Sequence, residues 1–383
     1  MPILEPRSWR AYKRIIQDRL MKNKKIAIIG TVGVPANYGG FETLAENLIK
    51  YHDAEHINDS LTVYCSSKSY ADKTPTYLSA RLKFLPLNAN GAQSVPYDIW
   101  SLVSAIWHRH DVILMLGVSG AVVLPLVRLF SSVRIVTNID GIEWRREKWR
   151  GVARQFLHFS EKMAVRFSHE VISDNDAIAE YVKNAYDLDS HVIAYGGDHA
   201  VTSEGVSIDE LGLPKSYVFS VCRIEPENNV HVILEAFSRI PSHALVMVGN
   251  WSYSVYGRAL KEKFGIFNNL FLLDPIYDLA TLKSLRSNAS FVIHGHSAGG
   301  TNPSLVEAMH FGKPVIAFDC NYNRSTTEDK AFYFKSSEDL IRLIDSMDAG
   351  EACSVGAGML EIAQRKYTWH TVAQKYFALL GEK

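Results

Sequence analysis

A loop rich in glycine and small polar residues, 294–309, holds the side chains best suited to bind an anionic ligand. In order, these are His294, His296, Gly299, Gly300, Thr301, Asn302, Pro303 and Glu307. Pro303 is typical of the first turn of a helix that Thr301 or Asn302 can cap, so the N–H groups of that turn would face a diphosphate. The carboxylate of Glu307 could accept hydrogen bonds from a sugar hydroxyl. A solvated surface role is the alternative, but the neighbours of Glu307 are apolar, and a buried acid needs a partner.

A second candidate is Arg223, which follows a predicted strand and precedes the run Glu-Pro-Glu-Asn-Asn at 225–229. A guanidinium group at the end of a strand can pair with the two phosphates of a diphosphate leaving group. The alternative is a surface arginine paired with Glu225 or Glu227.

Two more segments follow predicted strands. Gly39 and Gly40 belong to a glycine-rich stretch, 30–42, in which the backbone can closely approach a phosphate or sugar. The stretch is not a dinucleotide fingerprint, because the G-x-G-x-x-G spacing is absent and no acid follows the second predicted strand. A tight turn between strand and helix is the alternative.

The other segment, 137–149, contains Asp140 and Glu143, followed by Trp144, Arg145 and a basic, aromatic run. Such a run could stack on sugar rings or face a lipid phosphate. For the tryptophans, the alternative is an ordinary place in the core.

Short β-branched runs alternate with longer amphipathic ones, which predicts parallel strands joined by crossover helices. The predicted strands are Lys25–Gly30, Leu61–Cys65, Leu82–Leu87, Val112–Gly117, Arg134–Asn138, Glu170–Ser173, His191–Tyr195, Tyr217–Cys222, Ala244–Gly249, Leu270–Leu273, Phe291–His294, Pro314–Phe318 and Ala331–Phe334. We therefore expect an α/β protein with two doubly wound, Rossmann-like domains, 24–196 and 197–367. The candidate residues lie where ligands bind in such sheets, beyond the carboxyl ends of the strands. A closing helix, 368–383, is expected to pack back on the first domain.

Composition narrows the class of protein. The chain has 383 residues, 47% of them hydrophobic, with 41 basic and 41 acidic side chains, so no charge excess indicates nucleic acid as a partner. Four cysteines without C-x-x-C spacing favour a reducing cytoplasm over a disulfide framework or a zinc site. The uncharged run Val112–Val127 is too short to span a membrane. The leader, 1–23, is basic and amphipathic and lacks the apolar core of a signal peptide, so it could contact an anionic membrane or simply be solvated.

At the candidate segments the sequence resembles bacterial glycosyltransferases of the GT-B fold, family 4, and within them the rhamnosyltransferases that build polysaccharides. Residues 30–43 resemble the motif G-T-x-G-x-P-A-x-Y-G-G-F-E-T of that branch, and residues 294–309 resemble H-G-H-S-x-G-G-T-N-P-S-L-x-E-A-M. Shorter matches lie at 96–99, 140–144 and 223–229. The resemblance runs from about residue 24 to the end of the chain.

The resemblance implies transfer, with retention, of L-rhamnose from dTDP-L-rhamnose to a saccharide acceptor, which we expect to be lipid-linked. It also implies a cytoplasmic protein, peripheral on the cytoplasmic face of the membrane. Asp140 is expected to be a base or a ligand of the donor sugar, with a helix-capping role as the alternative, and Arg223 to stabilise the leaving diphosphate. The donor side would comprise Gly39, Gly40, Arg223, His294, His296, Gly299, Gly300, Thr301, Asn302 and Glu307. The acceptor side would comprise Tyr38, Glu143, Trp144 and Arg145.

Two positions depart from the broader family. Gly299 stands where the first glutamate of its E-x7-E motif would fall, and Asn228 stands where it usually has a lysine. We therefore assign part of the diphosphate neutralisation to Arg223, to the helix amides after Gly300, and to His294 or His296.

Other functions remain as alternatives. An NDP-sugar 2-epimerase or a non-catalytic nucleotide-sugar binding protein would share the architecture, whereas a dehydrogenase lacks support without its fingerprint. Asp174-Asn175-Asp176 satisfies the D-x-D pattern that binds metal in the other major glycosyltransferase fold. Because the triplet opens a predicted helix, where Asp and Asn are common caps, we expect neither a metal nor a cofactor.

Overall fold

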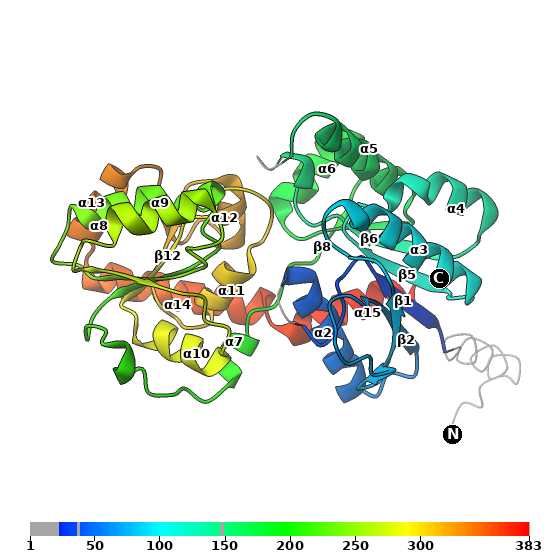
Figure 1. Cartoon of the computed structure of the whole chain (residues 1–383), viewed down its shortest axis with the longest axis horizontal. Helices are drawn as coiled ribbons and strands as arrows, with labels where there is room; N and C mark the ends of the chain where they lie inside the picture. The colour runs from blue at the N-terminus through cyan, green and yellow to red at the C-terminus, as the bar shows by residue number, and fades with distance from the viewer. Residues whose placement is uncertain (1–22, 37–38, 146–148, 383) are drawn as a thin grey trace, which may run out of the picture.

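Strands form at each of the apolar runs that predict them, and they assemble into two sheets (Figure 1). The computed structural model describes residues 23–36, 39–145 and 149–382. The first sheet has the order β3-β4-β2-β1-β5-β6-β7-β8, and all neighbouring strands are parallel except β3 and β4. Its strands are β1 Lys25–Ile29, β2 Ser60–Ser66, β3 Thr76–Tyr77, β4 Ala80–Leu85, β5 Val112–Leu116, β6 Arg134–Asn138, β7 Glu170–Ser173 and β8 His191–Val192.

The second sheet is parallel throughout, with the order β11-β10-β9-β12-β13-β14. Its strands are β9 Val218–Val221, β10 Leu245–Val248, β11 Leu270–Leu273, β12 Phe291–His294, β13 Val315–Phe318 and β14 Phe332–Phe334. Two Rossmann-like domains therefore form an α/β fold, as the alternating pattern predicts. Two details differ from the sequence prediction: the short edge strand β3 was not foreseen, and β8 ends earlier than expected.

Helices cover both faces of the first sheet. One face carries α3 Ser94–Trp107, α4 Leu124–Phe130, α5 Gly151–Phe167 and α6 Asp176–Tyr186, and the other carries α2 Gly40–Ala54 and α15 Trp369–Gly381. Strand β1 shows why both faces need cover, because Ile26 and Ile28 point into one core while Ala27 and Ile29 point into the other. The described part of this domain also contains the 3-10 turns η1 Gly91–Gln93, η2 Ala121–Val123 and η3 Glu143–Arg145.

The helices of the second domain enclose its sheet in the same way. They are α7 His199–Thr202, α8 Val230–Ser238, α9 Val255–Phe264, α10 Leu279–Asn288, α11 Pro303–Met309, α12 Asn321–Thr326, α13 Ser337–Ser346 and α14 Ala349–Lys366, with the turns η4 Asp209–Leu211 and η5 Pro226–Asn228.

The chain crosses between the domains twice. The first crossing follows β8, and the second runs from α14 to α15, the orange and red helices of Figure 1. The two crossings are joined by hydrogen bonds: Gly197 N–H donates to the Tyr367 carbonyl at 2.7 Å, and Trp369 N–H donates to the Asp198 carboxylate at 2.7 Å. The domains are therefore connected by a hinge that consists of two neighbouring segments of the chain.

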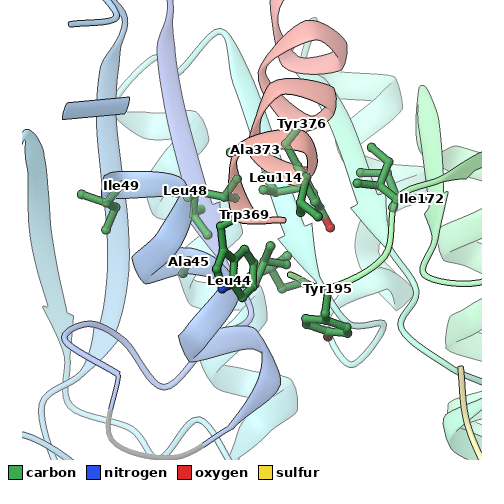
Figure 2. Close-up of a cluster of buried hydrophobic side chains, with 14 of the residues drawn as sticks. Leu44, Ala45, Leu48, Ile49, Leu114, Ile172, Tyr195, Trp369, Ala373 and Tyr376 are labelled. Atoms are coloured by element: carbon green, nitrogen blue, oxygen red, sulfur yellow. The ribbon is translucent and has the colours of Figure 1, made fainter. Parts of the chain in front are cut away.

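Helix α15 belongs to the core of the first domain, although it follows the whole second domain in sequence. It packs against α2, and its Ala373 and Tyr376 lie toward Leu114 of β5 in Figure 2. At its carboxyl end, the Lys24 ammonium donates to the carbonyl groups of Gly381 and Glu382. A cation at this end of a helix compensates the partial negative charge of the unpaired carbonyls.

Among the described residues, no helix combines the length and the apolar character that crossing a bilayer requires.

Candidate functional site

The loops at the carboxyl ends of the two sheets touch each other. A side chain on Gly141, which follows β6, would lie 2.7 Å from the Cα of Gly299 and 2.9 Å from the amide nitrogen of Gly300, both in the loop after β12. Such distances leave no space for a Cβ atom, so the contact requires glycine. The loop that was expected to hold a diphosphate thus lies directly against the segment that carries Asp140.

A carboxylate of the first domain reaches into the same loop. Asp174, which follows β7, accepts a hydrogen bond from the Thr301 N–H at 3.0 Å, and its carbonyl accepts one from the Thr301 hydroxyl at 2.6 Å. The carboxylate also lies so close to Gly300 that any side chain there would overlap it. At Thr301, therefore, a backbone N–H that was expected to bind an anion already has a negatively charged partner.

The neighbouring residues act as helix caps, as the sequence predicts. Asn175 accepts the Ala177 N–H at 2.8 Å at the start of α6, and Asn302 accepts the Ser304 N–H at 3.0 Å at the start of α11. Pro303 is the first residue of α11, as expected. The Asn175 amide also donates across the domain boundary to the Thr326 hydroxyl at 3.1 Å.

Asp140 lies where the two domains meet and has an unusual backbone conformation. Its φ of 59° lies in the left-handed region, which is uncommon for a residue with a side chain. The Asn138 side chain accepts its N–H at 2.7 Å, and the Tyr195 hydroxyl donates to its carboxylate at 3.3 Å. Burial and the Asp140 charge raise the pKa of Tyr195 well above its ordinary value, so the hydroxyl keeps its proton and remains a donor.

Gly39 and Gly40 reach the same region from β1. A side chain on Gly40 would meet the Tyr195 hydroxyl at 3.3 Å, which brings the start of α2 close to Asp140. Upstream, the amides of the glycine-rich stretch are less available than the sequence suggests. The buried Glu42 accepts the Val32 N–H at 2.7 Å, and Glu46 accepts the Ala36 N–H at 2.7 Å.

Arg223 lies after β9, exposed, and its segment is joined to the loop after β12. The Asn228 side chain donates to the Arg223 carbonyl at 2.8 Å and bonds the Nδ1 atom of His296, also at 2.8 Å. At 227, the backbone carbonyl accepts the Ser297 N–H at 2.9 Å. Asn228, which stands where the broader family has lysine, therefore connects two of the predicted donor segments.

His294 ends β12 and is 5% exposed. Burial, together with the charge of nearby His296, lowers its pKa to about 3, so the ring is neutral at physiological pH. Its Nε2 atom has no hydrogen-bond partner among the described residues. A buried imidazole nitrogen without a partner is costly, and a bound ligand would relieve that cost.

Glu307 has two partners that the sequence did not identify. The Arg286 guanidinium bonds one carboxylate oxygen, and the Nε2 atom of His199 lies 3.4 Å from the other. Burial alone would raise the pKa of Glu307, but the Arg286 charge and the His199 hydrogen bond leave it below its ordinary value. Trp369 donates to the Nδ1 atom of His199 at 2.9 Å, which connects Glu307 to the hinge. Glu307, the predicted ligand of the nucleoside sugar, is thus part of an ion pair in which Arg286 is buried and the carboxylate is partly buried.

On the predicted acceptor side, Trp144 and Arg145 lie against α5. The centres of the Trp144 and His158 rings lie 4.4 Å apart, with the rings tilted, and the guanidinium of Arg145 lies 5.1 Å from the centre of the Trp144 ring. Glu143 accepts the Trp149 indole N–H at 2.8 Å. Tyr38, the fourth residue assigned to this side, lies outside the described residues.

Sequence reasoning missed Glu161 of α5, which holds Trp144 of the predicted acceptor side in place by a hydrogen bond. Its carboxylate accepts the Trp144 indole N–H at 3.3 Å and the hydroxyls of Tyr181 and Tyr186 at 2.6 Å each. The available signal was a single acid on the apolar face of a helix, which must find partners when buried. Within the described part of the chain, no three His, Cys, Asp or Glu side chains are grouped as a metal site would require.

Two family models match parts of the chain. Residues 208–351 match the family "Glycosyl transferases group 1", and residues 23–198 match a domain of unknown function (DUF1972). No curated protein matches the chain.

Solved structures show the fold. Sucrose-phosphate synthase from Thermosynechococcus elongatus aligns with a TM-score of 0.78 and 17% identity, over 93% of this chain and 98% of that one. Anabaena HepE in complex with UDP aligns with a TM-score of 0.69 and 18% identity, over 93% of this chain and 99% of that one. The structure of trehalose-6-phosphate from E. coli bound with UDP-2-fluoro glucose aligns with a TM-score of 0.70 and 10% identity, over 94% of this chain and 99% of that one. The chain therefore has the GT-B fold, and residues 208–351 are similar to the group 1 glycosyl transferases.

The Glu307–Arg286 pair yields a prediction about stability. Arg286→Leu leaves a partly buried carboxylate with only His199 as partner, so we expect a loss of about 3 kcal/mol in the free energy of unfolding, measured by urea unfolding. The matched control is Arg239→Leu, which breaks an exposed pair with Glu338 and should cost less than about 1 kcal/mol. Equal losses in the two variants would contradict a stabilising role for the pair of Glu307 with the buried Arg286.

Proposed function

We propose that this chain is a retaining glycosyltransferase that moves L-rhamnose from dTDP-L-rhamnose to a saccharide acceptor in bacterial surface polysaccharide synthesis. One observation carries the proposal. The amide-rich loop of the group 1 domain and the Asp140 segment of the other domain meet at the carboxyl ends of both sheets. HepE, which shares the fold, binds UDP, and the proposal extends nucleotide-sugar binding to this chain.

The chemistry needs stabilisation of the negative charge that develops on the departing diphosphate. Arg223, the amides of Gly299 and Gly300, and the neutral ring of His294 are the groups we assign to it. The unpartnered Nε2 atom of His294 supports a ligand bound beside β12. The leaving phosphate can accept the proton of the acceptor hydroxyl on the same face of the sugar, so no carboxylate nucleophile is needed. No metal or cofactor enters this scheme.

Asp140 is assigned to the reacting sugar, as a base or as a ligand of a hydroxyl group. Its left-handed backbone, held by Asn138, and its contact with Tyr195 fix the carboxylate next to Gly141 and the donor loop. Holding a residue in a sparsely populated conformation costs about 1 kcal/mol or more, which is more common at functional sites than elsewhere. Glu307 is assigned to the nucleoside sugar of the donor, and Arg286 and His199 hold its carboxylate in position.

Identification of the donor tests the proposal. Purified protein is incubated with dTDP-L-rhamnose, UDP-glucose and GDP-mannose in the presence of EDTA, and its melting temperature is measured. A donor at about 100 times its dissociation constant adds about 2.7 kcal/mol to the stability of the folded state, so only the true donor should raise the melting temperature by several degrees. A shift with another nucleotide sugar alone would remove rhamnose from the proposal.

The same incubation separates the alternatives. Formation of an epimerised nucleotide sugar without acceptor would favour an NDP-sugar 2-epimerase. Donor binding without hydrolysis or transfer, with any saccharide acceptor offered, would favour a binding protein. The acceptor that we propose is lipid-linked, which makes the protein peripheral on the cytoplasmic face of the membrane.

Arg223→Ala should lower kcat by about two orders of magnitude, because removing one charge-stabilising donor from a transition state typically has this effect. The melting temperature should not change, since Arg223 is exposed. Arg258→Ala, another exposed arginine of the same domain, is the control and should keep the parental rate. Near-parental kcat in Arg223→Ala would remove its assignment.

Asp174→Asn should strengthen donor binding by about three- to tenfold, measured as the dissociation constant by calorimetry. In the parent, the carboxylate holds the Thr301 N–H and repels a diphosphate, and the amide removes that negative charge while keeping the shape. The control is Asp176→Asn, which removes an exposed acid two residues away. Unchanged or weaker donor binding in Asp174→Asn would show that the diphosphate does not compete with this carboxylate.

A further inference from the structure

The outer side of the first domain exposes large apolar side chains on three neighbouring helices. On α3, Trp100, Val103 and Trp107 share one face at spacings of three and four residues, and all are exposed. On α4, Leu126, Leu129 and Phe130 are exposed. The most exposed of these, Trp107, Leu129 and Phe130, leave 73% to 83% of their surface uncovered.

These helices lie on the same face of the sheet and form one surface. Helices α3, α4 and α5 share a single buried core on their inner sides, and α4 packs on α5. Gly120, just before η2 and α4, lies against the backbone of α3 at Ile99. Helix α5 also exposes apolar side chains, Val152 and Phe159, one heptad apart. In Figure 1, α3 and α4 lie on the side of the first domain that faces away from the second, and α5 runs along the top of this domain.

The charges on this surface have a single sign. The three helices contain four basic residues, all exposed, and two acids, both buried. The basic residues are Arg128, Arg154, Lys162 and Arg166, and the acids are Asp98 and Glu161. A surface that is both apolar and purely basic differs from a solvated helical face, where both signs are mixed, and from the typical core of a protein–protein interface, which has little charge.

We propose that this α3–α4–α5 surface docks on an anionic lipid bilayer. Tryptophan, phenylalanine and leucine side chains enter the boundary between headgroups and acyl chains, and lysine and arginine bind the lipid phosphates around them. The surface adjoins the proposed acceptor side, because Trp144 packs on His158 and Glu161 of α5. The docking itself does not depend on the proposed function. Only its purpose rests on that function, because docking would bring a lipid-linked acceptor to the site.

Vesicle co-sedimentation of the full-length chain tests this docking. Equimolar phosphatidylglycerol and phosphatidylcholine vesicles should bind the protein about tenfold or more better than phosphatidylcholine alone, and high salt should remove the difference. The triple variant Trp107→Gln, Leu129→Gln, Phe130→Gln should lose about tenfold or more in partitioning. The triple variant Arg128→Gln, Lys162→Gln, Arg166→Gln should lose the preference for anionic vesicles.

The second domain offers a matched control. Tyr253, Val255 and Ile266 are 76% to 77% exposed there, and their triple glutamine variant should bind vesicles like the parent. All variants keep residues 1–22, so parental binding by the Trp107 variant would assign membrane contact to another surface and overturn the proposal. No binding by the parent would also overturn it.

A second copy of the chain is the competing occupant. Sedimentation velocity should show the same oligomeric state for the parent and for the Trp107 variant, and a dimer that the variant dissociates would overturn the proposal.

Transfer to a detergent-solubilised acceptor separates this inference from the proposed function. Variants of the docking surface should keep that transfer, whereas its absence in the parent would count against the function and not against the docking.

Discussion

The candidate site depends on one constraint, which is that parallel strands end at a common edge. Loops after β1, β6, β7, β9 and β12 supply its residues, and they can meet because the two sheets turn those edges toward each other. Glycine makes the contact close, since Gly141 and Gly299 approach within the distance that a side chain would fill. Backbone geometry thus brings the loops of the site together, and the charged side chains act at the place where these loops meet.

The fold was largely predictable because its signal is local. Alternating apolar runs predicted thirteen strands, and the structure has a strand at each of them, including the four-residue runs 170–173 and 291–294. Cap residues were predictable for the same reason, as Asn175 and Asn302 show, because a cap bonds a backbone group two or three residues away. The two-residue strand β3 was missed, since two residues carry no periodicity.

The site was less predictable because its partners lie far apart in sequence. Glu307 needed a partner, but nothing in the sequence indicates Arg286 or His199 over any other basic residue. Likewise, Asp174 was expected only to cap a helix, whereas its contact with Thr301 spans 127 positions of the chain. Sequence patterns specify which groups are available, and the packing of two domains decides which of them meet.

The position of α15 has a consequence for the order of folding. Val372, Ala373 and Tyr376 fill the core under β1 and β5, yet the ribosome makes them only after the whole second domain. A nascent first domain therefore leaves the part of one sheet face under α15 uncovered until translation passes residue 381, so the usual vectorial order, with the earlier domain completed first, does not apply to this chain.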